Sequence, residues 1–182
     1  MTDRVMPRRA RGRLAVYVVV PLALVLALLV VVLATRDPAS ERLARSPLVG
    51  RPAPAIEGTT VEGERFDLDR YAGRWVVVNF FATWCTPCRQ EHPELVRFEA
   101  EHEAVGDAAV VSVMFQDDAA TVRRFFDERG GDWPVVEDGT GETVLSYGVV
   151  KLPESYIIGP DGVVQAKFSS QVTAAALDRI VL

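Results

Sequence analysis

The chain has 182 residues, of which 49% are hydrophobic and 25% charged, and its formal net charge is −5. This length suits one domain of ordinary size with a substantial core, and eight Phe, three Trp and four Tyr exclude a disordered chain. Two cysteines are too few for a scaffold held together by disulfides, so they need another explanation.

Charge is distributed unevenly along the chain. Residues 1–36 carry six Arg against one Asp, a formal charge of +5, whereas the rest carries 14 basic against 24 acidic residues, a charge of −10. This asymmetry predicts two environments, one on each side of a membrane. The acidic part also argues against a nucleic-acid partner, because phosphate contacts need a basic face.

An uninterrupted apolar run extends from Leu14 to Ala34, directly after a cluster of arginines. As a helix it would be about 31 Å long, close to the thickness of a hydrocarbon core of about 30 Å. Basic flanks stay in the cytoplasm. We therefore predict a cytoplasmic N-terminus (residues 1–13), a single-pass signal-anchor (14–34) and a domain outside the cytoplasm. A cleavable signal peptide is the alternative, but its apolar region is usually only about 7–15 residues long.

Beyond the anchor, residues 35–54 contain four prolines and little apolar periodicity, which predicts a tether. Residues 55–182 then alternate between strand and helix patterns. The expected strands are 75–82, 108–115, 133–136, 155–158 and 163–169, and the expected helices are 86–104, 119–129, 142–147 and 173–181. This order predicts an α/β domain whose mixed central sheet is flanked by helices on both faces.

Both cysteines lie in the motif Trp84-Cys85-Thr86-Pro87-Cys88, where a buried strand gives way to a helix. The helix N-terminus favours the thiolate of Cys85. Cys88 lies one turn further along and deeper, so it can attack a mixed disulfide formed on Cys85. This spacing is typical of reversible thiol–disulfide exchange.

Other uses of the pair are less well supported. A zinc site needs about four ligands, but only His92 and His102 are available, and both lie on the same predicted helix. A structural disulfide usually closes a longer loop. A thiol peroxidase lacks its usual Thr/Cys/Arg constellation here. A Cu(I)-binding assembly factor stays possible, because thiolates select Cu(I). We expect no metal and no cofactor for the exchange reaction.

An ordered set of motifs carries a family resemblance. They are the entry segment 46–54, the CxxC stretch 84–93, the segment 133–138, Tyr147-Gly148-Val149, and Leu152-Pro153-Glu154-Ser155-Tyr156-Ile157-Ile158 with Asp161-Gly162. From residue 46 to about 170 the sequence resembles the membrane-anchored thioredoxin-like proteins of the TlpA/ResA family, most closely the cytochrome c biogenesis group CcmG (DsbE).

The resemblance implies a thioredoxin-like fold with an additional βα element in the middle, which the stretch 118–136 would supply. It also implies a reductase that acts on protein disulfides outside the cytoplasm, notably the haem-binding cysteine pair of apocytochrome c. Electrons would come from a membrane thiol carrier of the CcdA/DsbD type. A general extracytoplasmic oxidant or isomerase stays open, because only the reduction potential separates it from a reductant.

The resemblance also suggests residues around the sulfurs. It implies a cis bond between Leu152 and Pro153, which would expose the backbone of Leu152 to a substrate peptide. It further implies an acid beneath the active site at Glu91, where burial would raise the pKa and make the carboxylate a proton acceptor for Cys88. A solvated glutamate on a helix surface is the alternative reading of Glu91.

Four further residues have weaker interpretations. Trp84 would cover one side of the Cys85 sulfur, or serve only in packing. Glu154 would orient a partner or lie on the surface, and His92 is expected to be a partly exposed helix residue rather than a ligand. Asn79 stands where cytoplasmic thioredoxins carry a buried Asp, so proton handling would fall to Glu91 or Glu154.

Overall fold

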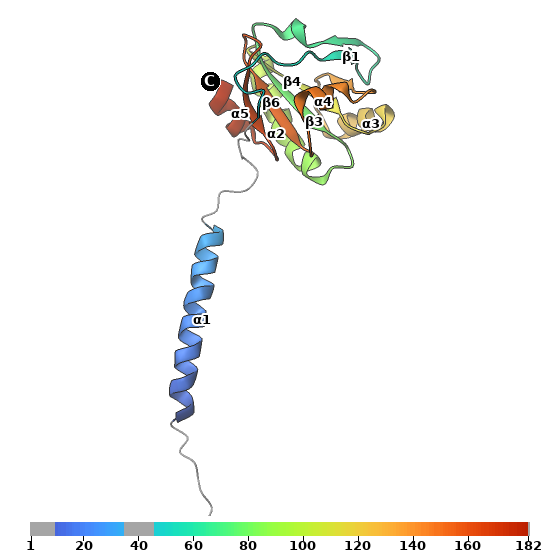
Figure 1. Cartoon of the computed structure of the whole chain (residues 1–182). Coiled ribbons are helices and arrows are strands. Elements are labelled where there is room, and N and C mark those ends of the chain that lie inside the picture. The colour runs from blue at the N-terminus through green and yellow to red at the C-terminus, as the bar shows by residue number, and fades with distance from the viewer. Residues whose placement is uncertain (1–9, 35–45, 182) are drawn as a thin grey trace, which may run out of the picture. The chain divides into compact units, whose positions relative to one another are not determined.

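The chain forms two compact units, one containing helix α1 (Ala10–Ala34) and the other the folded domain (Figure 1). The computed structural model describes residues 10–34 and 46–181, and within α1 it places side chains only for residues 17–29. Most of the predicted basic N-terminus and half of the predicted tether lie outside this range. Among the described residues, no helix is both long and apolar enough to cross a membrane.

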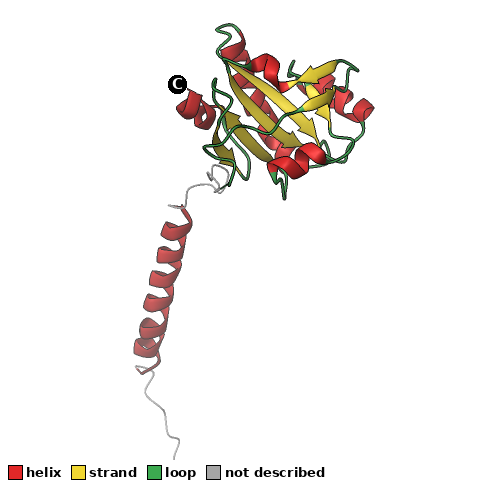
Figure 2. Cartoon of the chain, turned by 45° about the horizontal axis from the view of Figure 1, so that its top comes forward, coloured by secondary structure: helices red, strands yellow, loops and turns green. Residues whose placement is uncertain are grey.

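A five-stranded mixed sheet in the order β5-β4-β3-β6-β7 forms the centre of the domain. Figure 2 shows its strands in yellow, with helices packed beside them in red. The strands are β3 (Trp75–Phe81), β4 (Ala108–Met114), β5 (Val135–Glu137), β6 (Glu154–Ile158) and β7 (Val164–Phe168). The first three are parallel, and β6 is antiparallel to both of its neighbours. The central strand β3 is buried on both faces, which explains its near-continuous run of Val and Phe.

Helices cover both faces of this sheet, as predicted. Helices α2 (Thr86–Glu103), α3 (Ala119–Arg129) and α5 (Ala174–Val181) pack on one face, and α4 (Glu142–Tyr147) lies on the other. The connections β3-α2-β4 and β4-α3-β5 advance in the same direction across the sheet, so right-handed crossovers place α2 and α3 together. Residues 118–136 supply α3 and β5, where the family resemblance places the additional element.

The segment before the sheet differs from the prediction. Gly50 donates a backbone hydrogen bond to Val164 at 2.8 Å, and Val61 donates one to Val135 at 2.9 Å, so residues 50–61 extend from the edge strand β7 to the edge strand β5. Residues 46–54, predicted as tether, therefore belong to the domain. Their prolines are compatible with an extended segment at a sheet edge.

A small hairpin was also missed by the sequence pattern. It consists of β1 (Glu57–Thr59) and β2 (Arg65–Asp67), and a 3₁₀ helix, η2 (Leu68–Tyr71), follows it. Three-residue strands are too short to show an alternating pattern. The hairpin places Phe66 in the core on the face that α4 covers.

Candidate active site

The two cysteines form a disulfide at the junction of β3 and α2. Their Cα atoms are 5.3 Å apart, and the side chains are only 5% exposed at Cys85 and 3% exposed at Cys88. The Cys88 backbone N–H donates to the Cys85 Sγ at 3.2 Å, so Cys85 caps the helix. Pro87 fits the first turn because it needs no N–H partner there. A Cys85 thiolate would meet the same backbone donor and the positive end of the helix dipole.

A surface pocket of about 500 Å³ opens directly over Cys85. Its walls come from the CxxC loop, the end of β4 and the loop before β6: Trp84, Cys85, Thr86, Pro87, Phe115, Val149, Val150, Lys151 and Leu152. Cys88 does not line this pocket, which agrees with the prediction that it lies deeper. Most of the lining is apolar, with Lys151 as its only charged residue.

A larger pocket of about 690 Å³ lies elsewhere, between β1 and α4. Its lining is polar and acidic and includes Glu57, Glu137 and Asp138, but neither cysteine. The chemistry of the Cys pair therefore belongs to the smaller, apolar pocket.

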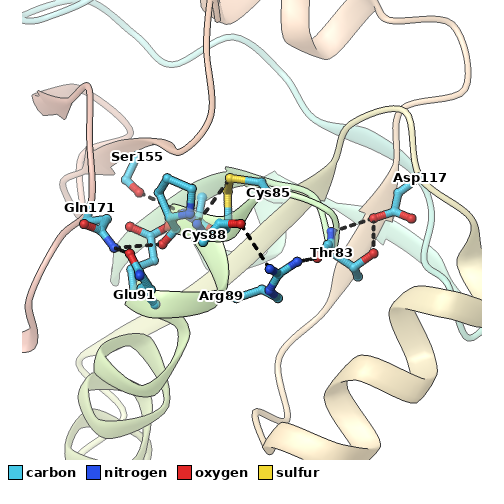
Figure 3. The surroundings of a disulfide bond; sticks show 12 residues. Thr83, Cys85, Cys88, Arg89, Glu91, Asp117, Ser155 and Gln171 are labelled. Carbon is cyan, nitrogen blue, oxygen red and sulfur yellow. Dashed lines mark hydrogen bonds between the residues drawn. A yellow bond between two sulfur atoms is a disulfide. The ribbon is translucent and has the colours of Figure 1, made fainter.

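The loop that leads into the motif is fixed by the loop after β4. Asp117 Oδ2 accepts hydrogen bonds from the Thr83 N–H at 2.6 Å and the Thr83 hydroxyl at 2.7 Å. The Trp84 indole N–H donates to the Gln116 carbonyl at 3.1 Å, and Arg89 donates to the Thr83 carbonyl at 2.8 Å. Figure 3 shows Thr83 and Asp117 on one side of the disulfide. The neighbouring Asp118 caps α3, and the role of Asp117 in fixing this loop was not predicted from the sequence.

Trp84 is 56% exposed and forms one wall of the pocket beside Cys85. This placement agrees with the expected cover over the sulfur. Leu152 also lines this pocket, and the peptide bond between Leu152 and Pro153 is cis, as the family resemblance predicted.

Glu91 lies buried beside the Cys pair, with only 2% of its surface exposed (Figure 3). Its Oε1 accepts a hydrogen bond from the Asn79 side chain at 2.9 Å, and its Oε2 accepts one from the Val172 backbone N–H at 3.0 Å. Burial raises the pKa of Glu91 to about 8, although both hydrogen bonds act to lower it. The solvated-helix interpretation of Glu91 is therefore wrong.

Glu154 does not reach the pocket. It is 1% exposed and forms an ion pair with Lys167, with Nζ and Oε2 2.8 Å apart. Both sequence interpretations of Glu154, a partner-orienting group and a surface residue, are therefore wrong in this conformation. The physical reason is the strand alternation: Ser155 faces α2 and the active site, so Glu154 faces the opposite side of the sheet.

His92 is also more buried than expected, with 4% exposure instead of partial exposure. Its Nε2 lies 2.7 Å from the Gly130 carbonyl, and its ring packs against Phe125, Phe126 and Trp133. Burial lowers the pKa of His92, so the neutral ring donates to the carbonyl. Within the described ranges, no group of three or more His, Cys, Asp or Glu side chains is placed to hold a metal.

These features define a class of protein. A CxxC pair lies at the start of a helix after the central strand of a mixed sheet, and a cis-proline directly precedes the neighbouring strand β6. The chain is a thiol–disulfide oxidoreductase with a thioredoxin-like fold.

Comparison with known proteins specifies the family. Residues 49–167 match the AhpC/TSA family model. Thioredoxin-like protein YneN of Bacillus subtilis is 35% identical over 64% of this chain and 68% of its own. Thiol-disulfide oxidoreductase ResA of Bacillus thuringiensis is 29% identical over 71% of this chain and 75% of its own. The crystal structure of a putative thiol:disulfide interchange protein DsbE from Chlorobium tepidum is 27% identical, with a TM-score of 0.66, and covers 73% of this chain and 94% of its own.

The chain therefore belongs to the AhpC/TSA family and, within it, to the TlpA/ResA/CcmG-like thioredoxin-like proteins.

Proposed function

We propose that the protein is a membrane-anchored reductant of protein disulfides outside the cytoplasm, and that its substrate is the haem-binding cysteine pair of apocytochrome c. The observation that carries the reductive direction is the buried carboxyl of Glu91 beside the Cys pair. The proposal is also supported by similarity to Thiol:disulfide interchange protein CycY of Rhizobium leguminosarum, which is 34% identical over 52% of this chain and 50% of its own.

The reaction requires only the two cysteines and the substrate disulfide. The Cys85 thiolate attacks one substrate sulfur, which forms a mixed disulfide and releases the other substrate sulfur as a thiolate that takes up a proton. Cys88 then loses its proton and attacks the Cys85 sulfur. The second substrate thiolate leaves and is protonated in turn. Two electrons have passed to the substrate, and the protein is left with the Cys85–Cys88 disulfide seen in the structure.

Glu91 favours the reductive direction for an electrostatic reason. Strong oxidants of this fold owe their potential to a stabilised thiolate in the reduced state. When Glu91 is ionised, its buried carboxylate opposes a thiolate at Cys88, which lies one helical turn away, and so destabilises the reduced pair. Reduced Cys85 and Cys88 then give up their electrons more readily. The ionised carboxylate of Glu91 accepts the Cys88 proton and the neutral carboxyl returns it, and a pKa of about 8 places this exchange near neutral pH.

The location rests on the sequence of the N-terminal region. The apolar run 14–34 and the arginine cluster before it support an anchor with its N-terminus in the cytoplasm. Anchoring would raise the effective concentration of the domain near a membrane thiol carrier of the CcdA/DsbD type, which would restore the reduced pair. Fusion of a reporter enzyme that is active only outside the cytoplasm to the C-terminus tests this topology, and an inactive reporter would contradict it.

The substrate proposal is tested by trapping. Reduced Cys88→Ala protein is mixed with a synthetic peptide that carries an oxidised Cys-x-x-Cys-His segment, and the products are separated without reductant. We expect a mixed disulfide at Cys85 that dithiothreitol releases, and none with Cys85→Ala. Absence of an adduct would contradict the exchange chemistry. Equal trapping of a scrambled disulfide peptide would instead favour a general isomerase.

A further inference from the structure

A buried polar network beside the Cys pair connects the strands β3 and β6 with helix α2 and the segment before α5. Asn79 in the centre of β3 donates from Nδ2 to Glu91 Oε1 at 2.9 Å and to Ser155 Oγ at 3.0 Å. All three side chains are at most 2% exposed. Because buried polar groups are costly when unpaired, each contact in this network has consequences for the others.

We propose that Asn79 is a positioning residue that holds the Glu91 carboxyl in place for proton exchange with Cys88. This inference rests on the proposed exchange chemistry at the Cys pair and adds a residue to it. Asn79 touches neither sulfur in any contact of the described residues, so its effect passes through Glu91.

The geometry gives Glu91 one donor for each oxygen. Asn79 holds Oε1, and the backbone N–H of Val172 holds Oε2. Because each of its oxygens accepts a hydrogen bond, the Glu91 carboxyl cannot rotate freely about the Cγ–Cδ bond. Both donors favour the ionised form, whereas burial favours the neutral form, so the proton affinity of Glu91 depends directly on Asn79.

Among the residues that the structure describes, no charged side chain donates to the Glu91 carboxyl. On the elements around Glu91, β3 contributes Asn79 and β6 contributes Ser155, while the segment before α5 contributes the Val172 backbone. The charged residues within strands β6 and β7 are Glu154 and Lys167, which pair with each other. The remaining titratable groups one turn away are on α2 itself. They are Cys88 and Glu94, and Glu94 Oε2 accepts from the Ala174 N–H and pairs with Arg97.

The Val172 donor is held by the packing of its own segment. Gln171 donates from Nε2 to the Pro87 carbonyl at 3.0 Å and to Gln90 Oε1 at 2.9 Å, which fastens residues 171–172 to the first turns of α2. The side chain of Val172 is buried in the same core as α5. Loss of Asn79 would therefore leave Glu91 with a single, fixed donor.

The test compares pH profiles of thiol reactivity in the full-length protein, purified in detergent and reduced beforehand. The rate of alkylation by iodoacetamide is measured from pH 5 to 10 for wild type, Asn79→Leu and Ser155→Ala. Leucine keeps a similar volume but donates nothing, so we expect the inflection that belongs to Glu91 to move up by about one pH unit. Ser155→Ala is the matched control, because it removes the second partner of Asn79 and leaves the Glu91 contact. Its profile should move by no more than about a few tenths of a pH unit.

The decisive comparison repeats Asn79→Leu in a Glu91→Gln background. If Asn79 acts through Glu91, Asn79→Leu should not shift the pH profile of alkylation any further once Glu91 is already replaced by Gln. An equal shift with Glu91 present or absent, or equal shifts for Asn79→Leu and Ser155→Ala, would overturn the proposal. Should Asn79→Leu fail to fold, Asn79→Asp keeps the shape and places a second carboxyl against Glu91. The added negative charge should move the Glu91 inflection of the alkylation profile to higher pH, and an unchanged profile would overturn the proposal. Because alkylation needs no protein substrate, a failure to reduce the peptide would count against the proposed function alone.

Discussion

The ammonium group of Lys167 lies 2.8 Å from the carboxylate of Glu154, and both side chains are buried within the β6-β7 hairpin. Lys167 also lies over the ring of Tyr156, 5.0 Å from its centroid. This pair explains how a glutamate directly after the cis-proline can point away from the active-site pocket without leaving an isolated charge in the core.

Removing one partner of this pair should destabilise the domain. Lys167→Met leaves the Glu154 carboxylate buried and uncompensated, so we expect the free energy of unfolding to fall by about 3–5 kcal/mol in urea denaturation. The double variant Glu154→Gln/Lys167→Met removes both charges and should recover most of the loss. A single variant as stable as wild type would show that the charge of Glu154 is not buried as described.

Trp84 should affect substrates of different size differently. Replacing it by Ala removes apolar surface from the pocket wall, and we expect about a tenfold lower reduction rate for an oxidised peptide with apolar flanking residues, or about 1.4 kcal/mol. A small disulfide such as hydroxyethyl disulfide should react within about twofold of the wild-type rate, because it does not depend on apolar contact with the Trp84 side chain. Trp84→Phe, which retains apolar area, should lie in between for the peptide. Equal losses for both substrates would instead indicate damage to the Cys pair.

Asp117 should matter for the stability of the loop before the motif. Asp117→Ala leaves the Thr83 N–H and hydroxyl without their acceptor, and we expect a loss of about 2 kcal/mol in the free energy of unfolding. Asp118→Ala is a suitable comparison, because it removes the N-cap of α3, which does not belong to the CxxC motif. Loss of such a cap costs about 1 kcal/mol. Only Asp117→Ala should also slow peptide reduction. If both variants slow it equally, the loop contact has no specific role.

His102 should make stability depend on pH. Its Nδ1 lies 2.8 Å from Asp107 and its Nε2 lies 3.2 Å from Asp178. Burial alone would lower the pKa of His102, but the hydrogen bonds and charges of the two aspartates outweigh it and raise the pKa above 6.5. A raised folded pKa means that the stabilisation is complete below about pH 6.5 and is lost as the pH rises through the folded value.

The free energy of unfolding of wild type should therefore fall across that interval, and that of His102→Gln should fall less. Urea denaturation at a series of pH values from 5.5 to 8.5 measures the difference. A gap between the two proteins that stays constant with pH would contradict the paired arrangement.

The order of the main strands and helices follows from the sequence because their signals are local. The run of Val and Phe in β3, the capping aspartate before α3 and the glycine that ends it each act within a few residues. The hairpin β1-β2 has no such local signal, because strands of three residues are too short for a sequence pattern and form only through pairing with another strand. The entry segment likewise follows the sheet edges through backbone hydrogen bonds to Val164 and Val135, which sequence patterns do not record.

At the site too, residues identified by a local motif were predicted, whereas residues placed by contacts distant in the sequence were not. The CxxC motif identifies Cys85 and Cys88 on its own, and the family resemblance correctly suggested the burial of Glu91 and the cis bond before Pro153. The direction of Glu154 depends on strand alternation relative to Ser155, and the depth of His92 depends on a cluster of aromatic rings from α3. Both were misjudged because their partners lie far away in the sequence.

The reduction potential of the Cys85–Cys88 pair tests the central claim most directly. The full-length protein is equilibrated with a series of glutathione or dithiothreitol redox buffers at pH 7, and the fraction oxidised is read by thiol alkylation and mass spectrometry. A reductant requires a potential near that of thioredoxin, about −270 mV. At pH 9, where Glu91 is mostly ionised, Glu91→Gln should make the potential less negative than that of wild type. A value near −120 mV, typical of strong oxidants of this fold, would contradict the proposed direction of electron flow.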